Sequence, residues 1–269
     1  MAKQSFAELL SPELIQCAAD QLGCDPEAVE TVLVVESVNG SGFLESGAVK
    51  ILYERHVAAR SLEKRGNRVT DIVRKHPQMA IDISFSPYAK GGYGKVNAQW
   101  GKFQRLAELP INDSEECAIM ACSWGAFQVL GENYESLDYK NPQEFRDAMQ
   151  TPQGQLDAFV RYVKANKLES ALKRRDWEAF ARGYNGRDYA KFGYHWKMQK
   201  EYVRIIGRNA PKKPVAISVT TQSAVGIGTT GAAGLTLLDQ VQGGIDQIQG
   251  VAEQVAGVKE QATGIISQI

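Results

Sequence analysis

The sequence has 269 residues, 43% of them hydrophobic and 23% charged, which is the composition of a globular protein with one substantial core and an appendage. Lysine plus arginine and aspartate plus glutamate both number 31, so the basic excess of a nucleic-acid-binding protein is absent and we expect no nucleic-acid partner. The four cysteines form no CxxC pair and there are only three histidines, which argues against a metal site.

The N-terminal half begins with helix signals. The first residues, MAKQSFAELL, lack the long apolar core of a signal peptide, so we expect the protein to stay in the cytoplasm until another component releases it. SPELIQCAADQLG has a Ser-Pro start and a glycine after its end, which predicts a helix. DPEAVETVLVVES repeats the Asp-Pro start and predicts a mostly buried helix that ends near Glu36.

A small β element follows. FLESGAVKILYERH contains a turn signal at 45–47 and a β-favouring run at 49–53, which together predict a short hairpin and then a helix over 56–64. Residues 66–99 have a weaker pattern, with a glycine-tyrosine loop in SPYAKGGYGK. Further helices are predicted at 98–109, 114–122, 142–149, 153–166, 169–174, 177–183 and 196–206. Residues 1–208 are therefore predicted to form one mainly α (α+β) domain with a small sheet.

The composition changes after APKKP. Residues 209–237 are predicted to be a linker rich in Gly, Ala and Thr, because the uncharged run 214–238 is too weakly apolar to favour its alternative, a membrane span. Apolar residues then recur every three or four positions over 238–269, which predicts an amphipathic helix that binds itself, a protein partner or a membrane. Its polar face has one lysine among Gln, Asp and Glu, so it has little attraction to anionic lipid.

Glu36 lies in an unusual setting, in VLVVESVNGSGF, at the end of an apolar helix and beside a glycine-rich turn. Partial burial disfavours the charged carboxylate and raises its pKa. A glutamic acid that stays protonated near neutral pH can act as the general acid in glycosidic-bond cleavage. The alternative is a helix-terminal glutamate that reaches solvent.

Two later stretches carry groups suited to a sugar: SWGAFQVLG at 123–131 and ARGYNG at 181–186. In this order, the three stretches resemble the lysozyme-like superfamily of goose-type lysozymes and lytic transglycosylases. That resemblance matches Glu36 to the catalytic acid, Gln128 to the glutamine of a Gly-x-x-Gln motif, and Tyr184 and Asn185 to a later Tyr-Asn pair.

A narrower resemblance rests on VESVNGSGFLESGAVKILYERH, GGYG, SWGAFQVLG and DWEAFARGYNG. Together these motifs look like the phage and prophage N-acetylmuramidases, endolysins that cleave bacterial peptidoglycan, over residues 25–205. The resemblance implies a mainly helical lysozyme-like fold and hydrolysis of the β-1,4 bond between N-acetylmuramic acid and N-acetylglucosamine, without a cofactor. It also implies action on the cell wall after release.

Within this interpretation Glu54 is the second catalytic carboxylate, which activates water or stabilises the cationic sugar. Its alternative role is an ion pair with Arg55 or another basic neighbour. His56 is a candidate to orient or polarise Glu54, and its alternative is a packed surface histidine. Tyr93 in GGYG is expected to line the cleft. The full set of expected substrate-binding residues is Ser37, His56, Tyr93, Ser123, Gln128, Tyr184 and Asn185.

Two other functions stay open at this point. A lytic transglycosylase would work with one glutamate and release 1,6-anhydro products. A non-catalytic wall-binding or structural protein would keep the lysozyme-like body without the chemistry.

Overall fold

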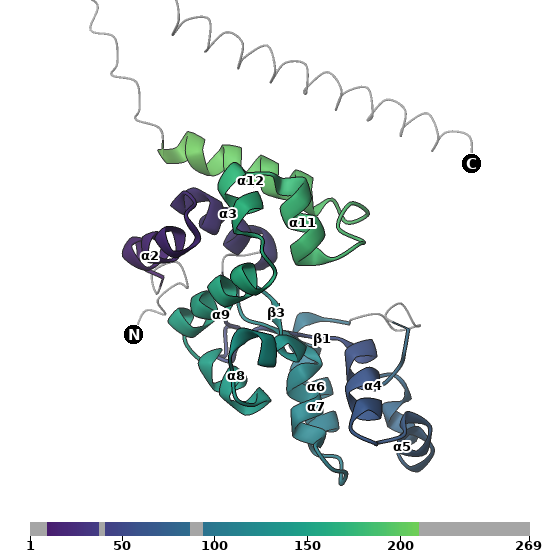
Figure 1. Cartoon of the computed structure of the whole chain (residues 1–269). Coiled ribbons are helices and arrows are strands. Elements are labelled where there is room, and N and C mark those ends of the chain that lie inside the picture. Colours follow the sequence, from purple (N-terminus) through teal and green to yellow (C-terminus); the bar gives the residue numbers. More distant parts are fainter. Residues whose placement is uncertain (1–9, 38–40, 87–93, 210–269) are drawn as a thin grey trace, which may run out of the picture. The chain divides into compact units, whose positions relative to one another are not determined.

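The computed structural model describes residues 10–37, 41–86 and 94–209 (Figure 1). The chain divides into two units, Met1–Lys212 and Lys213–Ile269, and every described residue belongs to the first. The predicted amphipathic helix at 238–269, the linker beyond Asn209 and Tyr93 lie outside the described residues. The helices are α2 (Pro12–Leu22), α3 (Pro26–Ser37), α4 (Arg55–Lys64), α5 (Val69–Lys75), α6 (Gln99–Ala107), α7 (Ser114–Met120), α8 (Pro142–Ala148), α9 (Pro152–Ala165), α10 (Glu169–Arg174), α11 (Trp177–Asn185) and α12 (Tyr194–Asn209).

The first two helices begin and end where the sequence predicts. The Ser11 hydroxyl accepts a hydrogen bond from the Leu14 amide at 3.4 Å, and Gly23 ends α2 with a φ of 64°. The Asp25 carboxylate accepts from the Ala28 amide at 2.8 Å at the start of α3. The Asp25 cap fixes the start of α3, and Glu36 lies in the last turn of this helix.

The predicted hairpin is present. Phe43 pairs with Val49, and the Leu44 amide donates to the Ala48 carbonyl at 2.8 Å across the turn. The chain then enters strand β1 (Ile51–Tyr53), which pairs antiparallel with β2 (Cys122–Trp124), and β2 pairs antiparallel with β3 (Val129–Leu130). The mainly helical fold with a small sheet is confirmed.

Strands β2 and β3 were not predicted. The helix expected over 114–122 ends at Met120, and the next residues leave it to form the middle strand of the sheet. Both strands are only two or three residues long and almost wholly buried, so they show no alternation of apolar and polar residues that a sequence pattern could reveal. Helix α5 also falls in the stretch 66–99, where the sequence pattern was weak.

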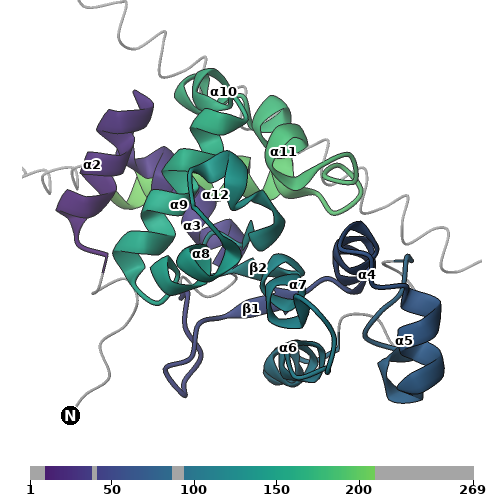
Figure 2. The ribbon, with the colours of Figure 1, turned by 60° about the horizontal axis from the view of Figure 1, so that its bottom comes forward.

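The helices form two groups around the sheet (Figures 1 and 2). In one group α3 packs against α2 and α12, α12 also packs against α11, and α2 contacts α9. In the other group α7 packs against α4 and α6, and α6 contacts β1. Helix α12 therefore covers α3, the helix that carries Glu36, although the two lie far apart in the sequence.

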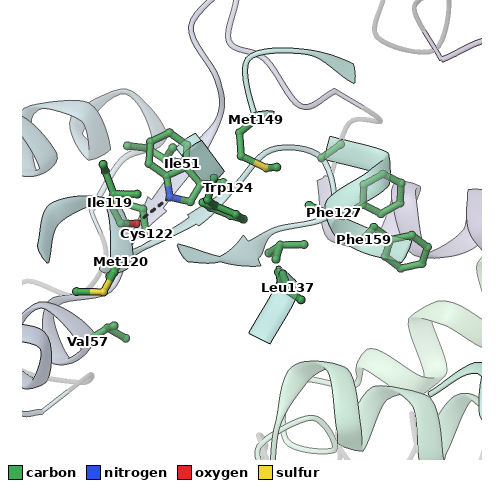
Figure 3. Packing of buried hydrophobic residues seen from close by; sticks show 14 of the residues in the cluster. Ile51, Val57, Ile119, Met120, Cys122, Trp124, Phe127, Leu137, Met149 and Phe159 are labelled. Atoms are coloured by element: carbon green, nitrogen blue, oxygen red, sulfur yellow. Dashed lines mark hydrogen bonds between the residues drawn. The ribbon is translucent and has the colours of Figure 1, made fainter. Parts of the chain in front are cut away.

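Trp124 lies at the centre of the core (Figure 3). Its side chain is 0% exposed, and its indole nitrogen donates to the Ile119 carbonyl at 3.0 Å. Trp100, Phe103 and Phe145 meet its ring edge-on at centroid distances of 5.8, 5.9 and 6.4 Å. The tryptophan of SWGAFQVLG thus packs the interior and is not available to stack on a sugar.

Replacing Trp124 with alanine should lower the free energy of unfolding by about 3–5 kcal/mol, because it leaves a large cavity and removes the hydrogen bond from the indole to the Ile119 carbonyl. Trp196→Ala is the matched control: Trp196 is 65% exposed, and the loss should stay within about 0.5 kcal/mol. Urea unfolding of both variants measures the difference. Equal losses would contradict this account of the core.

Candidate active site

A cleft with a volume of about 1070 Å³ lies between residues of the two helix groups. Among the residues that line it are the following predicted site residues: Glu36, Glu54, His56, Ser123, Gln128, Tyr184 and Asn185. They come from the end of α3, the junction of β1 and α4, strand β2 and the turn after it, and the end of α11.

Glu36 keeps its proton to a higher pH than an ordinary glutamate does. Burial raises its pKa from 4.5 to about 7, while the hydrogen bond from Asn185 and the positive charge of Lys197 act in the opposite direction. The Asn185 side-chain nitrogen donates to Oε1 of Glu36 at 2.8 Å. The carboxyl group therefore lies on the cleft wall with one oxygen already engaged.

The pair Tyr184 and Asn185 ends α11, and its two members do different things. The Tyr184 hydroxyl donates to the Phe127 carbonyl at 2.7 Å, and its ring stacks on Phe180 at a centroid distance of 5.2 Å. These contacts tie the end of α11 to the turn after β2. Asn185, the next residue, is thereby held beside Glu36.

Gln128 sits in a tight turn that a buried glutamine supports. Gly125 and Gln128 have φ values of 73° and 50°, and the side-chain nitrogen Nε2 of Gln128 donates to the Gly125 carbonyl at 2.7 Å. Buried Gln155 accepts from the Ala126 amide at 2.8 Å and donates to the Met149 carbonyl at 2.9 Å. A Cβ on Gly125 would lie 2.5 Å from the Gln155 side chain, so only glycine fits there.

Sequence reasoning missed Gln155. The only signal was a glutamine on the apolar face of α9, where a polar residue must find buried partners.

Glu54 is mounted where β1 passes into α4. Its amide donates to the Ala121 carbonyl at 2.7 Å, and its own carbonyl accepts from the Ala58 amide at 3.0 Å. Nδ1 of His56 lies 3.6 Å from Oε2 of Glu54. Burial and the charge of Arg60 lower the pKa of His56, which favours the neutral imidazole. The two side chains meet although the strand ends at Tyr53 and does not continue to His56.

Ser37 does not line the cleft. Its side chain is 0% exposed, and its hydroxyl donates to the Leu33 carbonyl at 2.6 Å within α3. Its own carbonyl accepts a hydrogen bond from the Lys50 ammonium group. This position does not support the substrate contact expected for Ser37, because the hydroxyl is used inside the helix. The other expected residue without a cleft position here, Tyr93, lies outside the described residues.

Two cleft tyrosines were not predicted. The pKa of Tyr162 is raised by burial and by the charge of Glu36. The pKa of Tyr194, the first residue of α12, is raised by burial and by the charges of both Glu36 and Glu54. Tyr194 is thus within electrostatic reach of both carboxylates, which places them around one site. The position of Tyr194 near the two carboxylates follows from the packing of α12 on α3, which no local sequence pattern predicts.

The described residues hold no cluster of three or more His, Cys, Asp or Glu side chains suited to a metal ion. Cys117 and Cys122 are buried, and burial raises the pKa of Cys117 to about 12, so its sulfur stays a thiol and is a poor nucleophile. In the same part of the chain no helix has the length and apolar character needed to cross a membrane.

A cleft with two carboxyl groups, one of which has a pKa raised by burial to about 7, in a mainly helical body with a small sheet is the arrangement expected of a glycoside hydrolase of the lysozyme-like type. The comparisons with known proteins give the family. Residues 25–206 match the family model for N-acetylmuramidase. The crystal structure of the Burkholderia AP3 phage endolysin is similar, with 36% sequence identity, a TM-score of 0.61, and coverage of 72% of this chain and 71% of that one.

The chain belongs to the N-acetylmuramidase family, which confirms the resemblance seen in the sequence motifs. It is a glycoside hydrolase that acts on peptidoglycan. No curated protein matches it.

The raised pKa of Glu36 predicts a pH-dependent cost in stability. The folded protein binds the Glu36 proton more tightly than the unfolded chain does, because the pKa is about 7 in one and 4.5 in the other. Its contribution to stability is therefore complete below pH 4.5 and is lost as the pH rises through 7. Glu36→Gln should match the wild type at acidic pH and exceed its unfolding free energy by about 1–3 kcal/mol at alkaline pH.

Urea unfolding at the two ends of this pH range measures the effect. A difference between the two proteins that does not change with pH would show that Glu36 ionises as an ordinary carboxyl group.

Proposed function

We propose that this protein hydrolyses the β-1,4 bond between N-acetylmuramic acid and N-acetylglucosamine in peptidoglycan, with Glu36 as the general acid. The observation that carries the proposal is the Glu36 carboxyl group, which has a pKa of about 7 and a bond from Asn185 in a cleft that also contains Glu54.

The bond from Asn185 defines where the Glu36 proton resides. Because Oε1 accepts from the Asn185 nitrogen, the acidic proton is carried by Oε2. Oε2 donates this proton to the glycosidic oxygen as the bond to the sugar breaks. The carboxylate that remains keeps the hydrogen bond from Asn185, which stabilises its new charge.

Glu54 is assigned the second role. It takes a proton from the attacking water, or it stabilises the oxocarbenium-like transition state through its negative charge. The neutral imidazole of His56, 3.6 Å away, orients this carboxylate. Gln128, in the turn after β2, and Ser123, in β2, offer polar groups to the sugar at the cleft wall. Tyr184 holds that wall in place.

Two expectations outside the described residues belong to the same proposal. Tyr93 is expected to contact the glycan, and the segment 238–269 is expected to bind a protein partner or a membrane. The site of action is the cell wall, which the protein reaches after its release from the cytoplasm.

Digestion of purified peptidoglycan followed by mass spectrometry of the soluble fragments tests the reaction. Wild-type protein should release fragments with reducing-end muramic acid, and Glu36→Gln and Glu54→Gln should each lower the rate at least about 10²-fold, because each removes a proton-transfer or charge-stabilising group. Glu178→Gln, an exposed carboxylate on α11, is the control and should retain full activity.

Two results would contradict the proposal in different ways. Anhydro products, lighter by one water, together with an active Glu54→Gln variant would identify a lytic transglycosylase. No fragments from the wild-type protein would favour the non-catalytic wall-binding function.

The pH profile of kcat/KM tests the general acid itself, because it reports the pKa of the free enzyme. Activity should fall as the pH rises through about 7, where Glu36 loses its proton. Asn185→Ala removes a donor that stabilises the carboxylate, so it should raise the pKa of Glu36 and shift this alkaline limb to higher pH. A shift to lower pH, or no alkaline limb at all, would contradict this role for Glu36.

A further inference from the structure

Two aromatic side chains are exposed on the cleft and have no role in the chemistry above. Phe85 is 60% exposed and Phe192 is 45% exposed, and both line the cleft. The described residues include other exposed large apolar side chains that are not part of the cleft lining, among them Ile81 and Trp196 at 59% and 65% exposed. Phe85 and Phe192 are therefore candidates for contact with the ligand, and Ile81 and Trp196 are matched control residues outside the cleft.

The two phenylalanines come from different walls. The Ser84 amide donates to the Arg55 carbonyl at 3.4 Å, so the segment with Phe85 lies against the start of α4, directly after Glu54. Phe192 lies in the connection between α11 and α12, between Asn185 and Tyr194. Its amide donates to the Asp188 carbonyl at 3.2 Å, and Nζ of Lys191 lies 5.6 Å from its ring centre. Phe85 therefore lies on the side of the cleft that carries Glu54, and Phe192 lies on the side that carries Glu36.

The cleft is large for a binding site. Its volume of about 1070 Å³ is at the upper limit of the ~300–1,000 Å³ typical of sites for one drug-sized molecule. The faces of pyranose rings carry C–H groups that pack on aromatic rings, and an exposed aromatic side chain in a binding cleft gains by being covered. A polymer of sugars supplies such faces at regular intervals along both walls.

We propose that Phe85 and Phe192 are sugar-stacking residues that bind glycan units beyond the two sugars joined by the cleaved bond. The inference rests on the proposed function and deepens it. The enzyme then binds the interior of a long glycan strand more strongly than a short fragment, because only the longer chain covers both rings. Binding energy from these remote units supports cleavage at Glu36 and Glu54 without a contact to the reacting atoms.

Soluble glycan strands separated by length test the proposal. For the wild type, kcat/KM should rise with strand length until both rings are covered. Phe85→Ala and Phe192→Ala should each lower kcat/KM on long strands about three- to tenfold, the worth of one aromatic contact, and leave the shortest cleaved fragment unaffected. Phe→Tyr at either position should restore the rate, while Ile81→Ala and Trp196→Ala should match the wild type at every length.

Pelleting with insoluble peptidoglycan separates binding from catalysis. In a Glu36→Gln background, which cleaves the wall at least about 10²-fold more slowly, the double change Phe85→Ala and Phe192→Ala should weaken binding more than either single change, and Trp196→Ala should not weaken it. The inference would be overturned if kcat/KM of the double variant rose with strand length as in the wild type and its pelleting were unchanged. The muramidase function would then stay intact. An inactive wild-type protein would overturn the proposed function, and this inference with it.

Discussion

The hydrogen bond between Asn185 and Glu36 joins residues 149 positions apart in the chain, and the site depends on it. Glu36 is placed by the capped helix α3, and Asn185 is placed by the last turn of α11. Two further contacts hold these ends together: the packing of α12 on α3 and α11, and the bond from the Tyr184 hydroxyl to the Phe127 carbonyl. Without them the carboxyl group would be more solvated and its pKa would return toward that of an ordinary glutamate.

The second carboxylate depends on the sheet in a similar way. Pairing of β1 with β2, extended by the bond from the Glu54 amide to Ala121, puts Glu54 at a rigid junction. The same strand β2 buries Trp124 and leads into the turn with Gln128, so one short segment, SWGAFQVL, joins the core to the cleft wall. Because this segment serves both the core and the cleft wall, some groups that look like sugar ligands in the sequence have structural roles. Trp124 packs in the interior, and the Tyr184 hydroxyl donates a hydrogen bond to a backbone carbonyl.

Local signals predicted much of this architecture. The caps at Ser11 and Asp25, the hairpin turn and the apolar approach to Glu36 act over a few residues, and each is found. The features that were missed depend on contacts between distant segments. Strands β2 and β3 are too short and too buried to show an alternation of apolar and polar residues. The role of Gln155 depends on its contact with the turn at Gly125, which lies far from it in the sequence. Tyr194 lies near the two carboxylates only because α12 packs on α3. Ser37 was expected to bind substrate because it follows Glu36, but its hydroxyl donates a hydrogen bond to the Leu33 carbonyl within its own helix.

The central claim is that burial keeps Glu36 protonated near neutral pH. Direct titration of its carboxyl carbon by NMR, with carbon-13 in the glutamate side chains and the Glu36→Gln variant to assign the signal, measures that ionisation without relying on activity. The account predicts a midpoint at about pH 7. A midpoint near the ordinary value of 4.5 would contradict it, because Glu36 would then be ionised at neutral pH and unable to act as the acid.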